Sequence, residues 1–207
     1  MKNLPIYDVL DDIKTTLNTE STLILEAPPG AGKSTVVPIS LLNESWLGNK
    51  VIIMLEPRRV AARMVAVQMA KLLGEEVGQS VGYQVKMESC YSKQTKLLVV
   101  TEAILVRKLQ SDQALEDVAM VIFDEFHERS IHTDLSLALC LQVQELLRPD
   151  LKLLIMSATL DSLELTNLLG KIPVINSKGK IYDVENIYLE TNIKQPDSKN
   201  INTLLLN

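Results

Sequence analysis

The segment Ala27–Thr35 contains the residue types that bind nucleotide phosphates. It follows the apolar run Thr22–Leu25 and leads into a sequence typical of a helix. This order of strand, glycine-rich loop and helix is the setting in which backbone N–H groups hold phosphates. The pattern G-x-x-x-x-G-K-[ST] fails only at its first position, where Ala27 replaces glycine. The alternative is a glycine-rich turn with a lone lysine, and we predict a phosphate site in preference to it. The site is formed by Ala27, Pro28, Pro29, Gly30, Ala31, Gly32, Lys33, Ser34 and Thr35.

The glycines and prolines of this loop decide where its hydrogen-bond donors lie. Gly30 and Gly32 carry no Cβ, which permits a tight turn and a close approach to a phosphate. Pro28 and Pro29 have no backbone N–H, so the donors that face a phosphate begin at Gly30. These donors add to the positive end of the following helix, and together they predict a concave anion site.

An acidic pair, Asp124 and Glu125, directly follows the apolar run Val118–Phe123. Together with the phosphate loop it supplies what hydrolysis of a γ-phosphate needs. We expect Lys33 to reach the β- and γ-phosphates, and Ser34 and Asp124 to hold Mg²⁺, Asp124 either directly or through water. Glu125 would orient and deprotonate the attacking water. The alternative, an acidic turn that caps a helix, is disfavoured because the pair lies downstream of a phosphate loop.

Two histidines raise the question of a zinc site, because the sequence that starts at His127 is similar to H-E-x-x-H. The second histidine, His132, comes one residue too late for that motif. On a helix the two side chains would lie roughly 140° apart, at ~100° per residue. They cannot share one face of a helix, so we exclude zinc.

Five short apolar runs predict strands that are buried on both faces of a parallel sheet. Each run is followed at once by polar residues. Ligands bind at the carboxyl ends of strands in such sheets, so the polar residues should gather along one edge. The runs are Thr22–Leu25, Val51–Leu55, Leu97–Val100, Val118–Phe123 and Leu151–Met156.

The segments between these runs are long enough for crossover helices, which predicts an α/β fold with a mostly parallel sheet sandwiched by helices. Pro38 lies inside the helix expected after the phosphate loop and should kink it. Val81–Val85 and Ile181–Leu189 are candidate further strands. Apolar periodicity favours helices at Pro5–Leu17, Arg59–Leu73, Glu102–Gln110, His132–Leu147 and Asp161–Leu169.

Composition restricts the classes of partner. The chain has 207 residues and a formal net charge of −5, which gives no global attraction to nucleic acid. Any such binding must therefore use a local basic strip, for which Arg58, Arg59 and Arg63 are candidates; solvated surface charge is the alternative. Cys90 and Cys140 show no metal-ligand spacing and read as free thiols without a disulfide. No signal or membrane-spanning segment is visible, so we expect a cytoplasmic monomer.

These motifs, in this order, resemble the first RecA-like domain of a superfamily 2 helicase of the DEAH-box class, and alanine at the first position of motif I is usual there. The resemblance covers most of residues 1–190 and implies a RecA-like P-loop NTPase fold. The sequences Glu-Pro-Arg-Arg-Val-Ala-Ala-Arg, Val-Gly-Tyr-Gln and Asp-Glu-Phe-His-Glu-Arg-Ser point to a bacterial member. The matching segments are Ala27–Thr35 (motif I), Glu56–Arg63 (Ia), Thr101–Leu105 (Ib), Asp124–His127 (II) and Ser157–Thr159 (III).

The resemblance implies the ATP-binding half of an ATP-dependent nucleic-acid helicase that uses ATP and Mg²⁺ and acts on single-stranded RNA. Lys33, Ser34, Asp124 and Glu125 would have the roles given above. His127 would couple the nucleotide site to a second domain. Ser157 and Thr159 would link hydrolysis to unwinding. The residues that would contact the nucleic-acid backbone are Arg58, Arg59 and Thr101.

Two features depart from the family pattern. Related RNA helicases often stack adenine on an arginine in the helix after motif Ia, and Gln68 occupies that position here. No Q-R-x-G-R-x-G-R segment is present, so motifs IV to VI and the arginine finger are missing. We expect residues 1–190 to form the N-terminal RecA-like domain, and residues 191–207 to be a linker and the start of a missing second RecA-like domain.

Two other functions are alternatives to a helicase. A non-enzymatic ATP- or RNA-binding module that works through partners would keep the same loop and basic strip. Another kind of P-loop ATPase is disfavoured, because it would not require the segments that match motifs Ia and III.

Overall fold

The computed structural model describes residues 4–158, 169–170 and 172–178. Within them one sheet of eight strands has the order β4-β3-β5-β2-β6-β7-β1-β8. Neighbouring strands are parallel except β3 and β4, which are antiparallel. The strands are β1 (Thr22–Glu26), β2 (Val51–Leu55), β3 (Val81–Val85), β4 (Glu88–Cys90), β5 (Leu97–Val100), β6 (Val118–Phe123), β7 (Lys152–Ser157) and β8 (Val174–Asn176).

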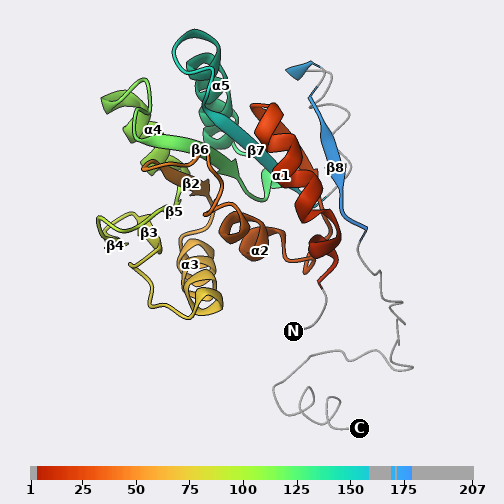
Figure 1. Ribbon diagram of the computed structural model, residues 1–207. Helices are drawn as coiled ribbons and strands as arrows, with labels where there is room; N and C mark the ends of the chain where they lie inside the picture. Colours follow the sequence, from red (N-terminus) through yellow and green to blue (C-terminus); the bar gives the residue numbers. More distant parts are fainter. Residues whose placement is uncertain (1–3, 159–168, 171, 179–207) are drawn as a thin grey trace, which may run out of the picture.

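Helices cover both faces of the sheet, with α1, α2 and α3 on one side and α4 and α5 on the other (Figure 1). This arrangement confirms the predicted α/β class, a mostly parallel sheet sandwiched by helices. The helices are α1 (Leu10–Thr19), α2 (Lys33–Ser40), α3 (Arg59–Leu73), α4 (Glu102–Ser111) and α5 (Ile131–Leu146), with short 3₁₀ helices η1 (Pro5–Val9) and η2 (Phe126–Glu128).

The central strands are buried on both faces, as their continuous apolar sequences require. All six residues of β6 are buried, and from Met120 onward successive side chains alternate between two cores. Met120 and Ile122 face the core under α1, α2 and α3, whereas Val121 and Phe123 face the core under α4 and α5. This alternation fixes the face on which each residue after a strand end projects.

Small residues let α3 lie close to the sheet. Its buried side chains are Ala62, Ala66, Met69 and Ala70. The helix ends at Gly74, whose φ of 74° is left-handed and therefore suits glycine. The opposite face of α3 is exposed.

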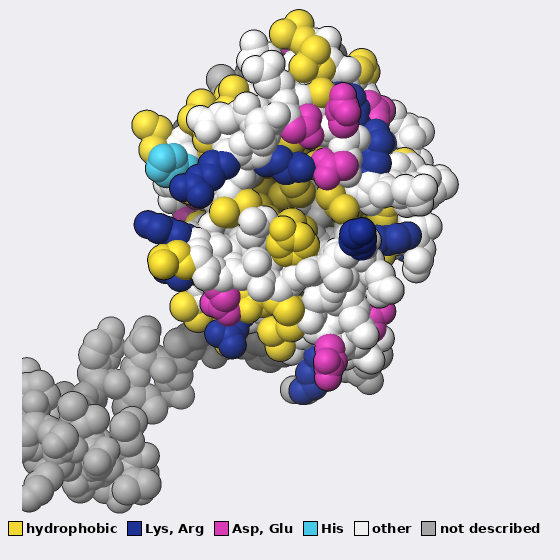
Figure 2. Space-filling model, turned by 90° about the vertical axis from the view of Figure 1, so that its left-hand side faces the viewer, with side chains coloured by type: hydrophobic (Ala, Val, Ile, Leu, Met, Phe, Trp, Pro, Cys, Tyr) yellow, Lys and Arg dark blue, Asp and Glu magenta, His cyan; other side chains and the backbone are white. Residues whose placement is uncertain are grey.

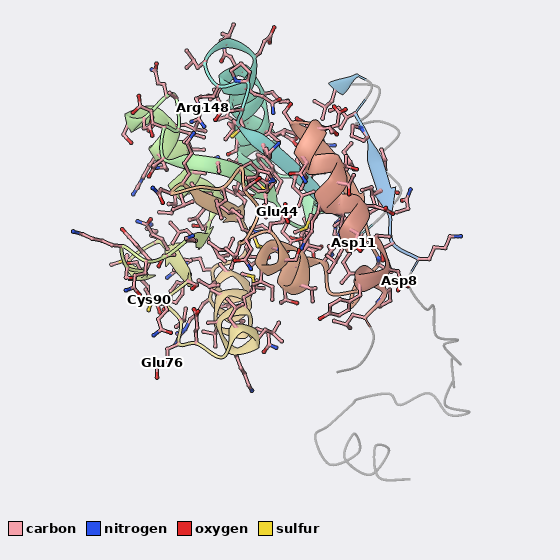
Figure 3. The ribbon with its side chains drawn as sticks, viewed as in Figure 1. Asp8, Asp11, Glu44, Glu76, Cys90 and Arg148 are labelled. Atoms are coloured by element: carbon pink, nitrogen blue, oxygen red, sulfur yellow. The ribbon has the colours of Figure 1, made fainter. Side chains whose placement is uncertain are left out.

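The C-terminal end of α5 is tied to the segment that precedes β6. The Arg148 side chain, labelled in Figure 3, donates hydrogen bonds to the carbonyls of Ala114, Leu115 and Val118. Its Nε also donates to Asp150 at 2.7 Å, and this contact holds the pKa of the Asp150 carboxyl well below its usual range. These bonds hold α5 in position at the sheet edge opposite the predicted site.

The predicted elements agree with the structure to within one or two residues at each boundary, except at the N-terminus. There, the predicted helix Pro5–Leu17 begins as the 3₁₀ helix η1 and continues as α1. The candidate strand Val81–Val85 is β3, and α2 continues past Pro38 to Ser40. The short strands β4 and β8 were not predicted, because three residues are too few to show a period.

Several sequence predictions fall on residues outside the described part. These are most of the helix Asp161–Leu169, the strand Ile181–Leu189 and the domain boundary at residues 190–191. Cys90, labelled on β4 in Figure 3, and Cys140 are both free thiols. No helix in the described residues is long and apolar enough to cross a membrane.

Candidate nucleotide and nucleic-acid site

The phosphate loop connects the carboxyl end of β1 to the first turn of α2. Gly32 caps α2 with a left-handed φ of 98°, and Gly30 also has a positive φ of 77°. A Cβ on Gly32 would come within 2.9 Å of Leu4 Cδ1, so another residue would have to displace that side chain as well as adopt the strained φ. The Ile6 N–H donates to the Ala31 carbonyl at 3.3 Å, which ties the loop to η1.

Several backbone donors of this loop are available to an anion. Among the described residues, the N–H groups of Gly30, Gly32, Lys33 and Ser34 have no backbone acceptor. Lys33 and Ser34 open α2, where N–H groups normally lack intrahelical partners. The donors therefore begin at Gly30, as the sequence predicts, and they lie at the positive end of a helix.

Lys33, Glu125, His127 and Ala158 form a chain of contacts across the strand ends. Lys33, which is buried, donates from Nζ to Glu125 Oε1 at 2.8 Å. The other oxygen of Glu125, Oε2, lies 3.4 Å from His127 Nε2. The Ala158 N–H in turn donates to His127 Nδ1 at 3.3 Å. This chain connects motif I through motif II to the residue after Ser157.

The backbone at Glu125 is strained in a way that positions its side chain. Its φ is 49° and its ψ is 39°, a left-handed conformation that costs a non-glycine residue about 1 to 2 kcal/mol. The turn redirects the chain from β6 into η2. Strain of this kind is found where a side chain must be held for function.

Asp124 is buried and has the features of a cation ligand. Its Oδ1 accepts the Glu125 N–H at 2.9 Å, whereas its buried Oδ2 has no hydrogen-bond partner among the described residues. Burial raises the pKa of Asp124 to about 6, and the Ser34 hydroxyl and the Lys33 ammonium oppose this shift. A divalent cation beside Asp124 and Ser34 would satisfy the orphaned oxygen, so this donor set fits Mg²⁺.

No cluster of three or more His, Cys, Asp or Glu side chains in the described residues forms a metal site of its own. His127 lies in η2 and His132 in α5. The structure therefore places the two histidines on separate elements.

A second carboxyl, that of Glu56, lies beside Asp124 at the next strand end. Glu56 is only 3% exposed, and its Oε1 has no partner in the described residues. Burial raises the pKa of Glu56 to about 7, and the charge of Asp124 adds to this shift. Glu56 belongs to the segment that matches motif Ia, and no role was predicted for it. Its position after a buried strand was the signal that could have identified it.

The arginines of the basic strip all have partners within the chain. Arg58 is exposed and pairs with Glu128 at 2.9 Å, and Arg59 donates to the Lys86 carbonyl. Arg63 lies 3.5 Å from Glu88. Figure 2 shows that Lys and Arg side chains on the face it presents alternate with Asp and Glu rather than forming one continuous basic patch.

Thr101 lies at the carboxyl end of β5, where it caps α4 without a side-chain hydrogen bond. The next residue, Glu102, accepts hydrogen bonds from the hydroxyls of Ser130 at 2.7 Å and Thr133 at 2.5 Å. This contact joins the first turns of α4 and α5. The sequence places Glu102 at this edge, within Thr101–Leu105, but does not predict its partners Ser130 and Thr133.

Ser157 ends β7 and is buried, and its carbonyl accepts the Ala27 N–H at 3.0 Å. Motif III therefore lies directly beside the start of the phosphate loop. Thr159 lies outside the described residues. Gln68 is exposed on α3 and lines an open hollow of about 780 Å³ with Arg59, Val60 and Met64.

Comparison with known proteins places this arrangement in a family. Residues 11–168 match the model of the DEAD/DEAH box helicase family. The chain is 50% identical over 189 residues to the ATP-dependent RNA helicase HrpB of Escherichia coli (strain K12), and this match covers 91% of the chain. It is 36% identical over 204 residues, 94% of the chain, to the ATP-dependent RNA helicase DHX29 of Mus musculus.

The fold agrees with a solved structure of the same kind. The crystal structure of the E. coli DEAH/RHA helicase HrpB matches 98% of the chain with a TM-score of 0.89 and 47% identity. The chain spans only a part of these relatives: 23% of HrpB and 15% of DHX29 by sequence, and 26% of the HrpB chain in the crystal.

Proposed function

Because this chain belongs to the DEAD/DEAH box helicase family, we propose that it is the ATP-binding part of an ATP-dependent RNA helicase. In this role it couples ATP hydrolysis to movement along, or unwinding of, a nucleic acid. One observation carries most of the proposal: a buried lysine after a glycine-rich loop contacts the glutamate of an acidic pair at the edge where the parallel strands end.

Each residue of the site has a defined task in this proposal. The free N–H groups that begin at Gly30 bind the phosphates, and Lys33 leaves Glu125 to contact the β- and γ-phosphates. Glu125 is then free to accept a proton from the attacking water. Ser34 and Asp124 would hold Mg²⁺, which would supply positive charge to neutralise the transferred phosphoryl group.

His127 connects this chemistry to the rest of the site. It contacts Glu125 on one ring nitrogen and the backbone of Ala158 on the other, so a change at Glu125 reaches the motif III segment directly. Arg58, Arg59 and Thr101 contact the nucleic-acid backbone, which positions the strand without reading its sequence.

We further propose that residues 1–190 are the N-terminal RecA-like domain, and that a second RecA-like domain completes the nucleotide cleft. The match covers 23% and 26% of the HrpB chains, so these relatives are long enough to contain a second domain. The protein acts in the cytoplasm on single-stranded RNA.

Nucleotide binding tests the proposal. Lys33→Ala should abolish Mg²⁺·ADP binding measured by calorimetry, because it removes the charge that faces the phosphates. Lys50→Ala, which removes an exposed lysine paired with Asp150 at the start of β2, is the matched control and should bind as the wild type does. Equal affinity of the Lys33→Ala variant and the wild type would contradict the assignment.

Hydrolysis separates the helicase from a binding module that works through partners. In a chain extended to the length of the relatives, Glu125→Gln should keep ATP binding and stop phosphate release, since an amide cannot accept the proton of water. A protein that binds ATP but releases no phosphate in either form would favour the binding module.

A further inference from the structure

The predicted nucleic-acid residue Arg58 forms an ion pair with a residue of the segment that follows the acidic pair. Its Nη2 lies 2.9 Å from Glu128 Oε1. Arg58 comes just before α3, in the connection that leaves β2, whereas Glu128 lies in η2, after β6. The two strands pair in parallel, with Leu55 opposite Phe123. The ion pair therefore joins two neighbouring strand ends at the edge that carries the candidate site.

Glu128 is held in place by contacts on both sides of it. Its N–H donates to the Glu125 carbonyl at 2.9 Å, which closes the turn of η2. The next residue, Arg129, donates to both carboxylate oxygens of Asp134, each at 3.1 Å. The Arg129 guanidinium also lies 5.4 Å from the centroid of the Phe126 ring. These contacts fix the backbone from which the Glu128 carboxylate projects.

The same segment is tied to the helix that follows Thr101. Ser130 Oγ donates to Glu102 at 2.7 Å, and it accepts the Thr133 N–H at 3.0 Å. Ser130 thus caps α5 and contacts the first turn of α4 with one hydroxyl. Glu128 therefore belongs to an element that is anchored next to both parts of the predicted nucleic-acid contact, Arg58 and Thr101.

Arg58, in contrast, is free to change its partner. Its side chain is 65% exposed, and as the N-cap of α3 it makes no side-chain capping hydrogen bond. The first turn of α3 contains no acidic residue. A cation at the positive end of a helix is disfavoured unless an anion lies beside it. Glu128 supplies that anion, and arginine binds a phosphate with the same donors that it offers to a carboxylate.

We propose that Glu128 competes with the nucleic-acid backbone for Arg58 and so limits the affinity of the chain for nucleic acid. The inference rests on the proposed function, because it takes Arg58 as a contact to a backbone phosphate. Without a strand, Arg58 pairs with Glu128. A bound strand offers a phosphate in place of the carboxylate, and the pair opens. An ion pair this exposed to water stabilises the chain only slightly, so a phosphate can replace it, and the carboxylate recaptures Arg58 when the strand leaves.

The affinity for a fluorescein-labelled oligouridylate, measured by anisotropy in the absence of nucleotide, tests the competition. Glu128→Gln removes the charge and keeps the size of the side chain. It should tighten binding by about two- to five-fold, which is what an exposed ion pair is worth. Glu145→Gln removes the same charge from the exposed surface of α5 and should leave the affinity unchanged.

A double-mutant cycle shows whether the effect passes through Arg58. Arg58→Ala alone should weaken binding. In the Arg58→Ala background, Glu128→Gln should have no further effect, because the residue for which Glu128 competes is gone. Urea denaturation of each variant shows that it is folded. If Glu128→Gln does not fold, Glu128→Ala replaces it in the cycle, with the same expected results.

The outcomes distinguish the inference from the proposed function. A wild-type chain that binds no oligouridylate overturns the nucleic-acid part of the proposed function. If the wild type binds and Arg58→Ala does not weaken binding, Arg58 is no backbone contact and the competition is wrong.

The role of Glu128 can also fail by itself. If Arg58→Ala weakens binding but Glu128→Gln does not tighten it, the proposed function stands and the competition is wrong. The competition is equally wrong if Glu145→Gln tightens binding as much. A gain from Glu128→Gln that persists in the Arg58→Ala background would show that the carboxylate repels the strand directly, without holding Arg58.

Discussion

At the scale of single residues, the site combines groups that are costly to bury. Asp124 and Glu56 are both nearly inaccessible, and each has an oxygen with no partner among the described residues. Such groups persist where a ligand or a proton compensates them. Gly32 adds a backbone conformation that other residues adopt only with strain. These groups lower the free energy of unfolding in favour of ligand binding. Their cost can therefore be measured by substituting them and unfolding the variants.

The buried Glu56 carboxyl predicts a pH dependence of stability in the absence of metal and nucleotide. Its pKa rises from an ordinary value of 4.5 to about 7 on folding. The folded chain therefore loses stability as the pH rises through this range, because the ionised carboxyl is disfavoured in the interior.

Glu56→Gln removes that loss. The free energy of unfolding of this variant should equal that of the wild type at about pH 4 and exceed it by roughly 1 to 2 kcal/mol at about pH 8. The difference is smaller than the full pKa shift would give, because the carboxyl is partly solvated. Urea denaturation at both pH values checks this, with Glu145→Gln on the exposed surface of α5 as the control. A constant difference at the two pH values would contradict the burial argument.

The two glycines of the phosphate loop predict different costs of substitution. Gly32→Ala should destabilise the chain by about 2 to 4 kcal/mol, from left-handed strain and from overlap with Leu4. Gly30→Ala meets nothing within 4 Å, so only the strain of about 1 to 2 kcal/mol remains. Chemical denaturation of the two variants gives the comparison, and equal losses would show that Leu4 yields freely.

At the scale of elements, the sequence predicted the features that depend on short-range patterns, namely the strands and the polar residues that follow them. The apolar runs and the polar residues after them located all the strands of the site and their common edge, because both properties follow from a buried parallel strand. The contacts of Glu125 with Lys33 and His127 could not be predicted, since they depend on a left-handed turn that no pattern at Glu125 signals. The partners of Arg58 and Glu102 likewise come from elements far away in the sequence.

The start of α3 predicts how nucleic-acid binding depends on salt. Replacing Arg58 and Arg59 together with Ala should weaken binding of single-stranded RNA. It should also reduce the dependence of log affinity on log salt by about 1.4, since each contact to a single strand contributes ~0.7. Anisotropy titrations over a series of salt concentrations measure this, with Lys50→Ala as the control. An unchanged slope would show that these arginines serve only their partners within the chain.

At the scale of the whole molecule, the proposed site has a cation on only one side of the phosphates. Lys33 supplies a cation from this chain, and a second one opposite the phosphates is expected from the proposed second RecA-like domain. An arginine in that place is worth ~10³–10⁵ in rate. On the proposed function, the described residues supply the groups that bind the phosphates, and the second cation is expected from the proposed second domain.

This division predicts a difference between two lengths of chain. Residues 1–207 should hydrolyse ATP very slowly and with little stimulation by RNA. Extension past Asn207 to the length of the relatives should raise turnover by about 10³ or more and make it depend on RNA. Steady-state phosphate release with and without RNA checks both chains. Equal turnover would identify a self-sufficient ATPase.

The place of β1 in the sheet has a consequence for synthesis on the ribosome. The partners of β1 are β7 and β8, so Thr22 pairs with Leu153, about 130 residues later. At ordinary rates of translation that delay is on the order of ten seconds. Through that interval the apolar β1 has no strand beside it, and the phosphate loop lacks the bond between the Ala27 N–H and the Ser157 carbonyl. The nascent chain must therefore be shielded by chaperones or by local collapse, and it gains its nucleotide site only after Ser157 has left the exit tunnel.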